Sequence, residues 1–326
     1  MKSAKTMAIL FVVAGLAVLP LNAATTGHFE RTLQVSGPVD LKVTSDSGNI
    51  TVHPGNNSSV SVSAKIHANS TSWLFGGGNV EERIRRIEQN PPVVQHGNAI
   101  TIGKFDDRDL TRNISIDYDV TVPAKTHLTS STGSGDQNVS GLQSPATART
   151  GSGNITVENV SAEVHARSGS GDLKINAIKG ALYCDTGSGN IHADDIAGDV
   201  SASAGSGNIE VRQSAGGSVK AETGSGNIRL NGVKGGLRAS AGSGDIHAEG
   251  EPTSDWNLGA GSGNITLRVP THASFNIDAR TSSGSLTVKH PVTMQGTLSR
   301  KHIQGKVGNG GVLLDLHTGS GDIEVE

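Results

Sequence analysis

Asp185, Asp194 and Asp195 are the side chains of this 326-residue sequence whose type and spacing best suit a reaction, the cleavage of a glycosidic bond. Such cleavage uses two carboxyl groups, one as an acid and one as a base or nucleophile. The outward positions predicted beside them carry mixed charges, in the order Glu158, Asn176, Asp194, Arg212, Asn231, Glu249 and Arg268. This pattern is typical of a solvated, ion-paired surface. The sequence therefore predicts no catalytic residue, and a polysaccharide-active enzyme is an alternative.

The glycine-rich repeats and the histidines are the parts of the sequence that could bind a metal. Glycine- and aspartate-rich repeats bind Ca²⁺ in β-rolls, but with a nonapeptide period, and the period here is near 18 residues, with Asn replacing Asp in most copies. Ca²⁺ prefers several carboxylate oxygens. The twelve histidines are scattered, and His192 and His247 are predicted to lie three repeats apart, too far to share an ion. We therefore predict no metal and no cofactor.

Composition narrows the class of protein further. Aromatic residues make up 3% of the chain and its net charge is −3, which gives no basis for a nucleic-acid partner, since single-stranded readers use rows of stacked aromatic rings. Cys184 is the only cysteine, so no intrachain disulfide forms, and we interpret it as a small buried apolar residue. Tyr183 is the lone outward aromatic residue predicted on the regular strands.

The repeated tetrapeptide Gly-Ser-Gly-Asn/Asp dominates the chain. Its copies recur every 18 or 19 residues, and they open at Gly133, Gly151, Gly169, Gly187, Gly205, Gly224, Gly242 and Gly261. A degenerate copy follows at 282–285, Gly308–Gly311 is a further candidate, Gly319 opens the last copy, and an early one lies at 46–50. A period held over so many copies indicates a solenoid of stacked units.

Each unit alternates apolar and polar residues on both sides of the tetrapeptide. Apolar residues fall five and three places before its first glycine, as at Val164 and Ala166, and a second alternating run follows, as at Ile155 and Val157. Alternation with period two predicts half-buried strands. We therefore predict an all-β, single-chain parallel β-solenoid with two-strand rungs of about 18 residues, the alternative being two packed up-and-down sheets.

The tetrapeptides are predicted to form the turns of this solenoid. Their glycines permit backbone angles that side chains forbid and let stacked corners approach closely, and the serine hydroxyl can bond a backbone group. The second glycines are Gly135, Gly153, Gly171, Gly189, Gly207, Gly226, Gly244, Gly263 and Gly321. The fourth residues are predicted to form a hydrogen-bonded ladder through Asn154, Asp172, Asn190, Asn208, Asn227, Asp245 and Asn264.

Three segments are predicted along the chain. Residues 1–23 have the basic start, apolar run and small-residue cleavage site of a signal peptide, with an uncleaved anchor as the alternative. Residues 24–125 form a β region that starts or caps the solenoid, with a helix at about 79–90 capped by Asn79, and a hairpin around His96–Asn98. Residues 126–326 form the repeat solenoid. No transmembrane segment is predicted after removal of the signal.

Residues 169–211, together with "GPVDLKVTSDSGNITVHPG" at 37–55 and "ISIDYDVTVPAKTHLTSSTGSGD" at 114–136, resemble the bacterial "putative adhesin" family, a domain of unknown function with glycine-rich repeats. They are similar also to auto-transporter adhesin head domains. The resemblance covers about residues 28–326. It implies a right-handed β-helix-like fold in the cell envelope, and it assigns no catalytic residue.

These observations predict a non-enzymatic, exported protein of the periplasm or cell surface, a rigid rod that binds an envelope or surface partner, protein or glycan. A periplasmic accessory or sensor in envelope-stress signalling is an alternative.

Overall fold

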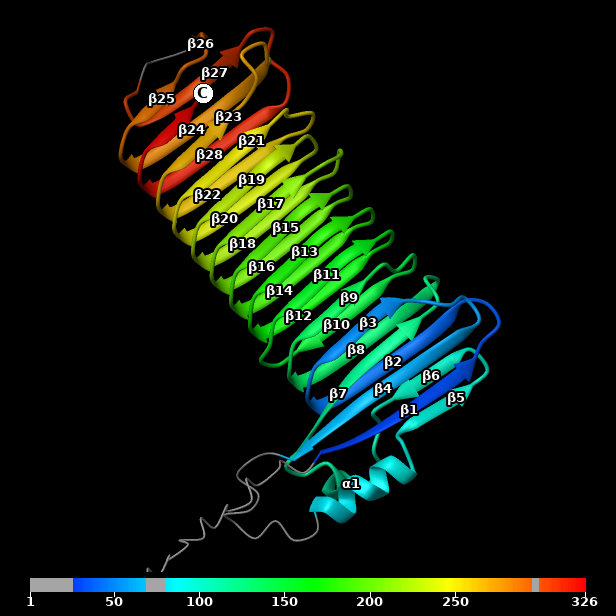
Figure 1. The fold of residues 1–326 in the computed structure, drawn as a ribbon. Coiled ribbons are helices and arrows are strands. Elements are labelled where there is room, and N and C mark those ends of the chain that lie inside the picture. The colour runs from blue at the N-terminus through cyan, green and yellow to red at the C-terminus, as the bar shows by residue number, and fades with distance from the viewer. Residues whose placement is uncertain (1–25, 69–79, 295–298) are drawn as a thin grey trace, which may run out of the picture.

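The computed structural model describes residues 26–68, 80–294 and 299–326. They form a rod whose two long sheets run along its axis and form its two opposite walls (Figure 1). The predicted signal peptide, the glycine run at 76–78 and the predicted helix cap Asn79 lie outside the described residues. Within the described residues no helix combines the length and the apolar character needed to span a bilayer.

Sheet A has 14 strands and forms one wall of the rod. In spatial order its strands are β1 (Thr26–Gln34), β4 (Ser59–Ala68), β7 (Ile114–Val122), β3 (Ile50–Pro54), β9 (Gln137–Ser140), β11 (Ile155–Val160), β13 (Leu173–Ile178), β15 (Ile191–Ile196), β17 (Ile209–Gln213), β19 (Ile228–Val233), β21 (Ile246–Gly250), β23 (Ile265–Arg268), β29 (Ile323–Val325) and β25 (Leu286–Val288).

Sheet B has 15 strands and forms the opposite wall. In spatial order its strands are β26 (Val292–Met294), β27 (His302–Val307), β24 (Phe275–Ser283), β28 (Leu313–Ser320), β22 (Trp256–Ser262), β20 (Leu237–Ser243), β18 (Val219–Ser225), β16 (Val200–Ser206), β14 (Leu182–Ser188), β12 (Val164–Ser170), β10 (Ala146–Thr150), β8 (Thr126–Ser134), β2 (Val39–Ser47), β6 (Ala99–Ile102) and β5 (Val93–His96).

Each rung consists of one strand of sheet B, a Gly-Ser-Gly turn and one strand of sheet A. Equivalent residues of neighbouring rungs pair in parallel, as Val164 does with Leu182 and Ile155 with Leu173. The predicted all-β parallel solenoid is therefore confirmed. The alternative of two up-and-down sheets is wrong, because strands joined by a turn lie in different sheets rather than pairing with each other.

The core is a narrow layer between the two walls. The strand phase is as predicted, since Val164 and Ala166 are buried while His165 and Arg167 point outward. The residue directly before the first glycine is buried as well, and it is often polar, as at Ser168 and Thr186. Its burial follows from the same period of two, which places it on the inner face with the two apolar residues before it.

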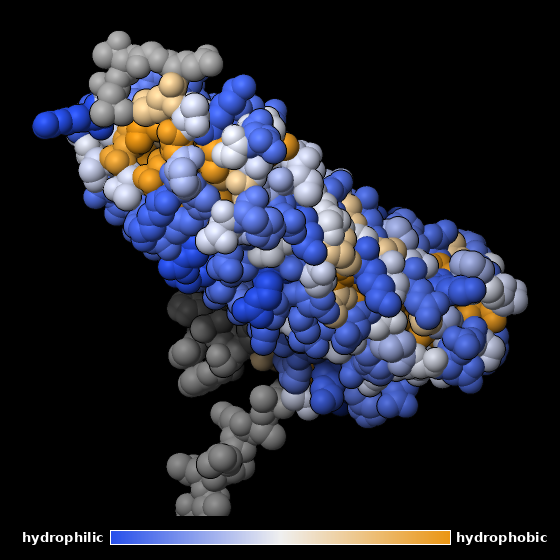
Figure 2. All heavy atoms as spheres, turned by 90° about the horizontal axis from the view of Figure 1, so that it is seen from above, coloured by the Kyte–Doolittle hydropathy of each residue, from blue (hydrophilic) through white to orange (hydrophobic). Residues whose placement is uncertain are grey.

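The rungs do not follow chain order at the C-terminal end. The last repeat, β28 and β29, lies between β22–β23 and β24–β25, so that β28 pairs with both β22 and β24. Gly308–Gly311, a candidate repeat copy, is not a rung turn, because it connects β27, which pairs antiparallel with β24, to the inserted strand β28. Apolar side chains gather in a patch at this end of the rod, whereas most of the remaining surface seen from this side is hydrophilic (Figure 2).

The N-terminal end is closed by antiparallel strands and one helix. The early repeat copy at 46–50 is the turn of a full rung, since β2 pairs in parallel with β8 and β3 with β9. Beyond it, β7 pairs in parallel with β3, β4 and β1 continue sheet A antiparallel, and the predicted hairpin β5–β6 continues sheet B. Helix α1 (Val80–Gln89) buries Val80, Ile84 and Ile87, and a short 3₁₀ helix, η1, spans Arg108–Leu110.

Helix α1 uses its charges to hold the end of the rod together. Arg83 donates hydrogen bonds to the carbonyl oxygens of Asp109 and Arg112, at 2.8 and 2.6 Å. Glu88 accepts a hydrogen bond from the backbone N–H of His28 in β1. The helix therefore fastens β1 and the η1 loop to the closing end.

Candidate functional site

The repeat turns leave no room for a side chain at their first and second glycines. A Cβ atom on Gly205 would lie 2.5 Å from the carbonyl oxygen of Gly187, and one on Gly207, whose φ is +151°, would lie 1.9 Å from that of Gly189. The same backbone overlap recurs at every predicted turn glycine from Gly133 to Gly263, and at Gly319 and Gly321. The regular stacking of these corners therefore depends on glycine, because the rungs approach at backbone distance.

The fourth residue of each turn forms a ladder along one corner of the rod. The backbone N–H of each residue donates to Oδ1 of the residue one rung below, as Asn154 donates to Asp136 at 2.8 Å and Asp172 to Asn154 at 2.9 Å. The ladder runs in spatial order through Asp117, Asn49, Asp136, Asn154, Asp172, Asn190, Asn208, Asn227, Asp245, Asn264, Asp322 and Ser285.

This ladder differs in form from stacked amides. Its bonds run from backbone to side chain. Direct side-chain bonds between neighbouring ladder residues of the described chain are limited to those from Asn190 to Asp172, at 3.2 Å, and from Ser285 to Asp322, at 2.8 Å. An acceptor oxygen is all that the position requires, so Asp serves as well as Asn. No two Asp residues are neighbours in the spatial order, which avoids repulsion between adjacent carboxylates.

The hydroxyl that bonds at these turns belongs to the residue before the first glycine. Oγ1 of Thr186 donates to the carbonyl oxygen of Gly171 at 2.9 Å, and Oγ of Ser168 donates to that of Gly153 at 2.8 Å. From the sequence, this role is expected of the serine within the tetrapeptide. Where that residue is Ser or Thr, its buried hydroxyl fastens the turn to the rung below, whereas Ala204, Ala241 and Ala260 have no hydroxyl at this position.

The three candidate catalytic carboxylates do not form a site. Asp185 lies on β14 of sheet B and pairs with Arg167 at 2.7 Å, whereas Asp194 lies on β15 of sheet A and pairs with Arg212 at 3.2 Å. Both side chains face outward, on opposite walls of the rod. Asp195, the next-to-last residue of β15, adopts a left-handed φ of +56°, a conformation that Asp tolerates better than most residues. Glycosidic cleavage by this group is therefore not supported.

The histidines and acidic residues also form no metal centre. Within the described ranges there is no group of three or more His, Cys, Asp or Glu side chains arranged to hold an ion. His192 instead lies 3.2 Å from Glu210 on the next rung, and Arg268 contacts Glu326 at 3.1 Å. His247, between Arg229 and Arg268, has its pKa lowered by partial burial and by these two cations. The outer wall of sheet A is thus a surface of exposed ion pairs.

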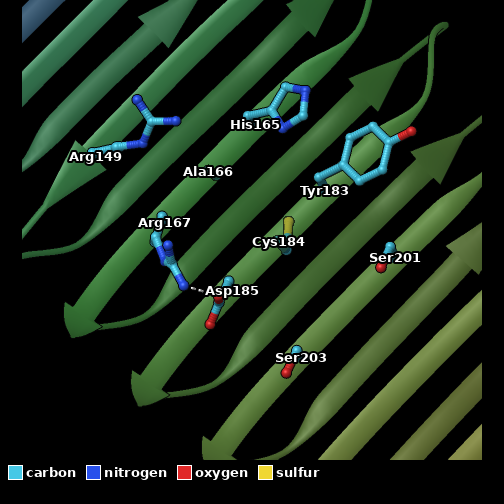
Figure 3. A pocket seen from close by; sticks show the side chains of 9 residues that line it. All are labelled: Arg149, His165, Ala166, Arg167, Tyr183, Cys184, Asp185, Ser201 and Ser203. Atoms are coloured by element: carbon cyan, nitrogen blue, oxygen red, sulfur yellow. Dashed lines mark hydrogen bonds and ion pairs between the residues drawn. The ribbon is translucent and has the colours of Figure 1, made fainter.

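Tyr183 marks the most distinctive part of the outer wall of sheet B. Its ring stacks on that of His165, one rung away, with centroids 4.5 Å apart and planes inclined by 7°. Tyr183 as a residue remains 42% exposed. The next residue in this row, Ser201, has no ring to continue the stack. Figure 3 shows the two rings side by side on β12 and β14, with Ser201 and Ser203 following on β16.

Two depressions meet at Tyr183, and we call them together the Tyr183 groove. One has a volume of about 280 Å³ and is lined by His165, Arg167, Asp185 and Arg149 among others. The other, of about 380 Å³, reaches Lys220, Arg238, Asp199 and Asp255. Both are lined by Tyr183 and Ser201. The exposed ring therefore borders two hollows on one wall.

Positive charge lines both ends of the Tyr183 groove. Arg167 pairs with Asp185, and Lys220 pairs with Glu222 at 3.1 Å. Arg149 and Arg238 have no ion pair among the residues that the structure describes. An anionic group entering the groove would find these guanidinium groups unpaired.

Cys184 lies beneath the Tyr183 groove, and its thiol is unreactive. Its side chain is 3% exposed, and burial, followed by the charge of Asp185, raises the pKa of its thiol to about 12. A thiol with this pKa stays protonated at neutral pH and is a poor nucleophile. Its burial agrees with the prediction of a small apolar residue.

The sequence predicts the outward position of Tyr183 but not the groove around it. The signal was present in the register, because His165, Tyr183 and Ser201 follow one another at 18-residue intervals and so lie on adjacent rungs. When the outward residues of sheet B are aligned in the same way as those of sheet A, one row contains the ring of His165, the ring of Tyr183 and then the short side chain of Ser201.

Comparison with known proteins identifies the fold family. Residues 34–191 and 162–326 match the family described as Toastrack DUF4097. A "putative cell adhesion protein" from Clostridium sporogenes is 10% identical, with a TM-score of 0.22, over 92% of this chain and 99% of its own. A "putative adhesin" from Bacteroides fragilis is 13% identical, with a TM-score of 0.31, over 92% and 97%. No curated protein matches the chain.

Proposed function

The chain belongs to the Toastrack DUF4097 family, and we propose that it is a non-enzymatic, exported envelope protein whose solenoid acts as a rigid module that binds a partner. The observation that carries this proposal is the Tyr183 groove, an exposed aromatic ring with unpaired cations on a regular wall. Because both walls are hydrogen-bonded rung to rung, the groove is held at fixed geometry before any partner arrives, which favours binding.

The arrangement of charges supports binding rather than catalysis. The acidic candidates Asp185 and Asp194 lie on opposite walls, each in an ion pair with an arginine. The thiol of Cys184 is buried and protonated. A hydrolytic site would instead need two carboxyl groups facing one another across the scissile bond.

Export and domain organisation are parts of the same proposal. Residues 1–23 act as the signal peptide, residues 24–125 start and cap the solenoid, and residues 126–326 form its repeats. The mature protein acts in the periplasm or at the cell surface, where an adhesin-like rod meets envelope proteins or glycans.

The location of the rod is the first test. The chain carries a tag after Glu326, and intact cells are treated with a protease too large to cross the outer membrane. Loss of the tag places the rod at the surface, as an adhesin requires. Survival of the tag until the outer membrane is opened confines the rod to the periplasm and excludes the adhesin function. Retention of the tag in the cytoplasm excludes export itself.

Binding is the second test. The purified chain from residue 24 is mixed with isolated cell envelopes, sedimented and quantified, with the heat-unfolded chain as the comparison. We expect saturable co-sedimentation of the folded chain only. Uniform failure to bind envelopes, cells or glycans would count against the binding function.

A further inference from the structure

The C-terminal end of the rod leaves the last strand of sheet A without a partner on one side. In the part of the chain that the structure describes, β25 pairs in parallel with β29 and ends its sheet. We propose that this open edge binds an extended, acidic strand of a partner protein, which adds to sheet A beyond β25. The surface is separate from the Tyr183 groove and does not depend on it.

The backbone of β25 directs hydrogen-bonding groups toward the open side. In a parallel pair, successive residues direct their N–H and C=O groups to opposite sides of the strand. The carbonyl oxygen of Ser285 accepts a hydrogen bond of 3.0 Å from the N–H of Ile323 in β29. The alternation then places the N–H and C=O groups of Leu286 and Val288 on the side away from β29, where a further strand would bond to them.

Sheet B extends beyond this edge and would cover an added strand. β24 and β25 belong to the same rung, but sheet B continues past β24 through β27 and β26, which face no described strand of sheet A (Figure 1). Ile303, on the inner face of β27, is partly buried, as are Leu286 and Val288. Ile323 and Val325, which hold the matching places in β29, are 1% and 0% exposed. A strand with apolar residues at alternate positions would bury the three exposed side chains.

The charges at this end favour an acidic strand. No Asp or Glu occurs between Ser282 and Leu314, a stretch with four Lys or Arg residues. The ammonium group of Lys301 donates to the carbonyl oxygen of Gly284, at the corner of the last rung, and Lys289 follows the other end of β25. Lysine at a sheet edge discourages pairing with most strands. A carboxylate beside these lysines would instead form charge-assisted hydrogen bonds, so charge complementarity selects an acidic partner.

The neighbour on the other side, β29, shows which sequence fits beside β25. Its residues Ile323 and Val325 align with the two apolar residues of β25, and its residues Glu324 and Glu326 contact Lys289 at 3.0 and 2.6 Å. The hydrogen bonds of a parallel sheet are evenly spaced, so a strand of the same pattern fits the open side. Main-chain bonds would supply affinity, and the alternate side chains would supply specificity.

The test is a titration of a fluorescent peptide, Ser-Gly-Asp-Ile-Glu-Val-Glu, with the folded chain from residue 24, followed by fluorescence anisotropy. The peptide has the sequence of residues 320–326. We expect saturable binding that high salt weakens and that Tyr183→Ala leaves unchanged.

Two N-methylated peptides test the pairing itself. Methylation at the peptide residue that matches Glu324 removes the N–H that would donate to the carbonyl oxygen of Leu286, and it should weaken binding by about ten-fold. Methylation at the residue that matches Val325 is the control, because this N–H would point away from β25 and the peptide should still bind.

Two lysine variants test the charge complementarity. Lys301→Gln should weaken binding by about three-fold. Lys306→Gln is the matched control, because Lys306 pairs with Asn276 on the outer face of sheet B and should not contact the peptide. Melting followed by circular dichroism verifies that both variants fold. Equal binding by the wild type and Lys301→Gln would contradict the acidic character of the partner.

Four further outcomes would overturn the proposal. Two are the absence of binding to the wild type and undiminished binding of the peptide methylated at the Glu324 position. The third is equal loss with both methylated peptides, because a peptide that replaced β29 would need the N–H groups on both of its sides. The fourth is a dimer in light scattering that the peptide does not dissociate, which would assign the edge to a second copy of the chain. The Tyr183 groove is tested separately, by envelope sedimentation.

Discussion

The backbone N–H of Asp322 donates a hydrogen bond of 2.8 Å to Oδ1 of Asn264, although 58 residues separate them in the chain. The last repeat is therefore inserted between two rungs that precede it, and its ladder residue takes its place between Asn264 and Ser285. The insertion makes the ladder continuous through the C-terminal end of the rod. The same order of rungs brings Glu326 of the last repeat into contact with Lys289 on one neighbouring rung and Arg268 on the other.

The glycine corners predict a large contrast between two alanine substitutions. Gly205→Ala places a Cβ 2.5 Å from the carbonyl oxygen of Gly187, in backbone that neighbouring rungs hold in place, whereas a Cβ on Gly216 meets nothing within 4 Å. We expect Gly205→Ala to lower the free energy of unfolding by about 2 kcal/mol and Gly216→Ala to change it by less than about 1 kcal/mol. Urea denaturation measures both, and equal midpoints would contradict the close approach of the corners.

The ladder predicts that the same substitution has different effects at two positions. Asn154→Asp keeps the acceptor oxygen but places three carboxylates in succession with Asp136 and Asp172. Asn208→Asp has Asn190 and Asn227 as neighbours. We expect a loss of about 0.5 to 1 kcal/mol for the first variant, reduced by high salt, and almost none for the second. Thermal melting at low and high salt tests this; the absence of any difference at low salt would refute the repulsion.

The strand phase predicts opposite outcomes for two adjacent residues. Ala202 is 2% exposed in the narrow core, whereas Ser201 faces outward. Ala202→Asp buries an unpaired carboxylate and should cost several kcal/mol. Ser201→Asp should be nearly neutral. Melting temperatures measured side by side decide the matter, and equal values would mean that the assigned phase is wrong.

Acid should destabilise the inserted rung formed by β28 and β29. One oxygen of Glu326 contacts Nζ of Lys289 at 2.6 Å and the other contacts Nε of Arg268 at 3.1 Å, which ties β29 to both neighbours. These contacts, that of Lys289 first, lower the pKa of Glu326 from 4.5 to about 2. A pKa lowered by folding adds stability above the ordinary pKa. That stability is lost as the pH falls from 4.5 toward 2.

The corresponding measurement compares melting temperatures over this acidic range. Glu326→Gln should lose less stability on acidification than the wild type, because the glutamine carries no charge at any pH. Glu158→Gln, on the same wall, is the control, and its melting temperature should fall on acidification as much as that of the wild type. A wild type and a Glu326→Gln variant that respond identically to acid would show that the ion pairs contribute nothing.

The groove at Tyr183 was only partly predictable. The outward position of Tyr183 follows from its place in an alternating run, since successive side chains of a strand point to opposite faces. Its stack on His165 and the place of Ser201 beside it depend on which rungs are neighbours and on the orientation of the rings. Those are relations between strands, and they appear only when the rungs are set in register.

The sequence by itself determined the rung, its two strands, its inner and outer residues and its glycine corners, because the 18-residue period and the alternation are local properties of the chain. Only the tertiary structure decided the order of the rungs at the two ends. The apolar residues of the last repeat are like those of every other, so the local pattern fits any neighbouring rung equally well. The closing strands, the antiparallel β27 and the ion pairs of Glu326 favour one neighbour over the others, and these contacts join residues far apart in the chain.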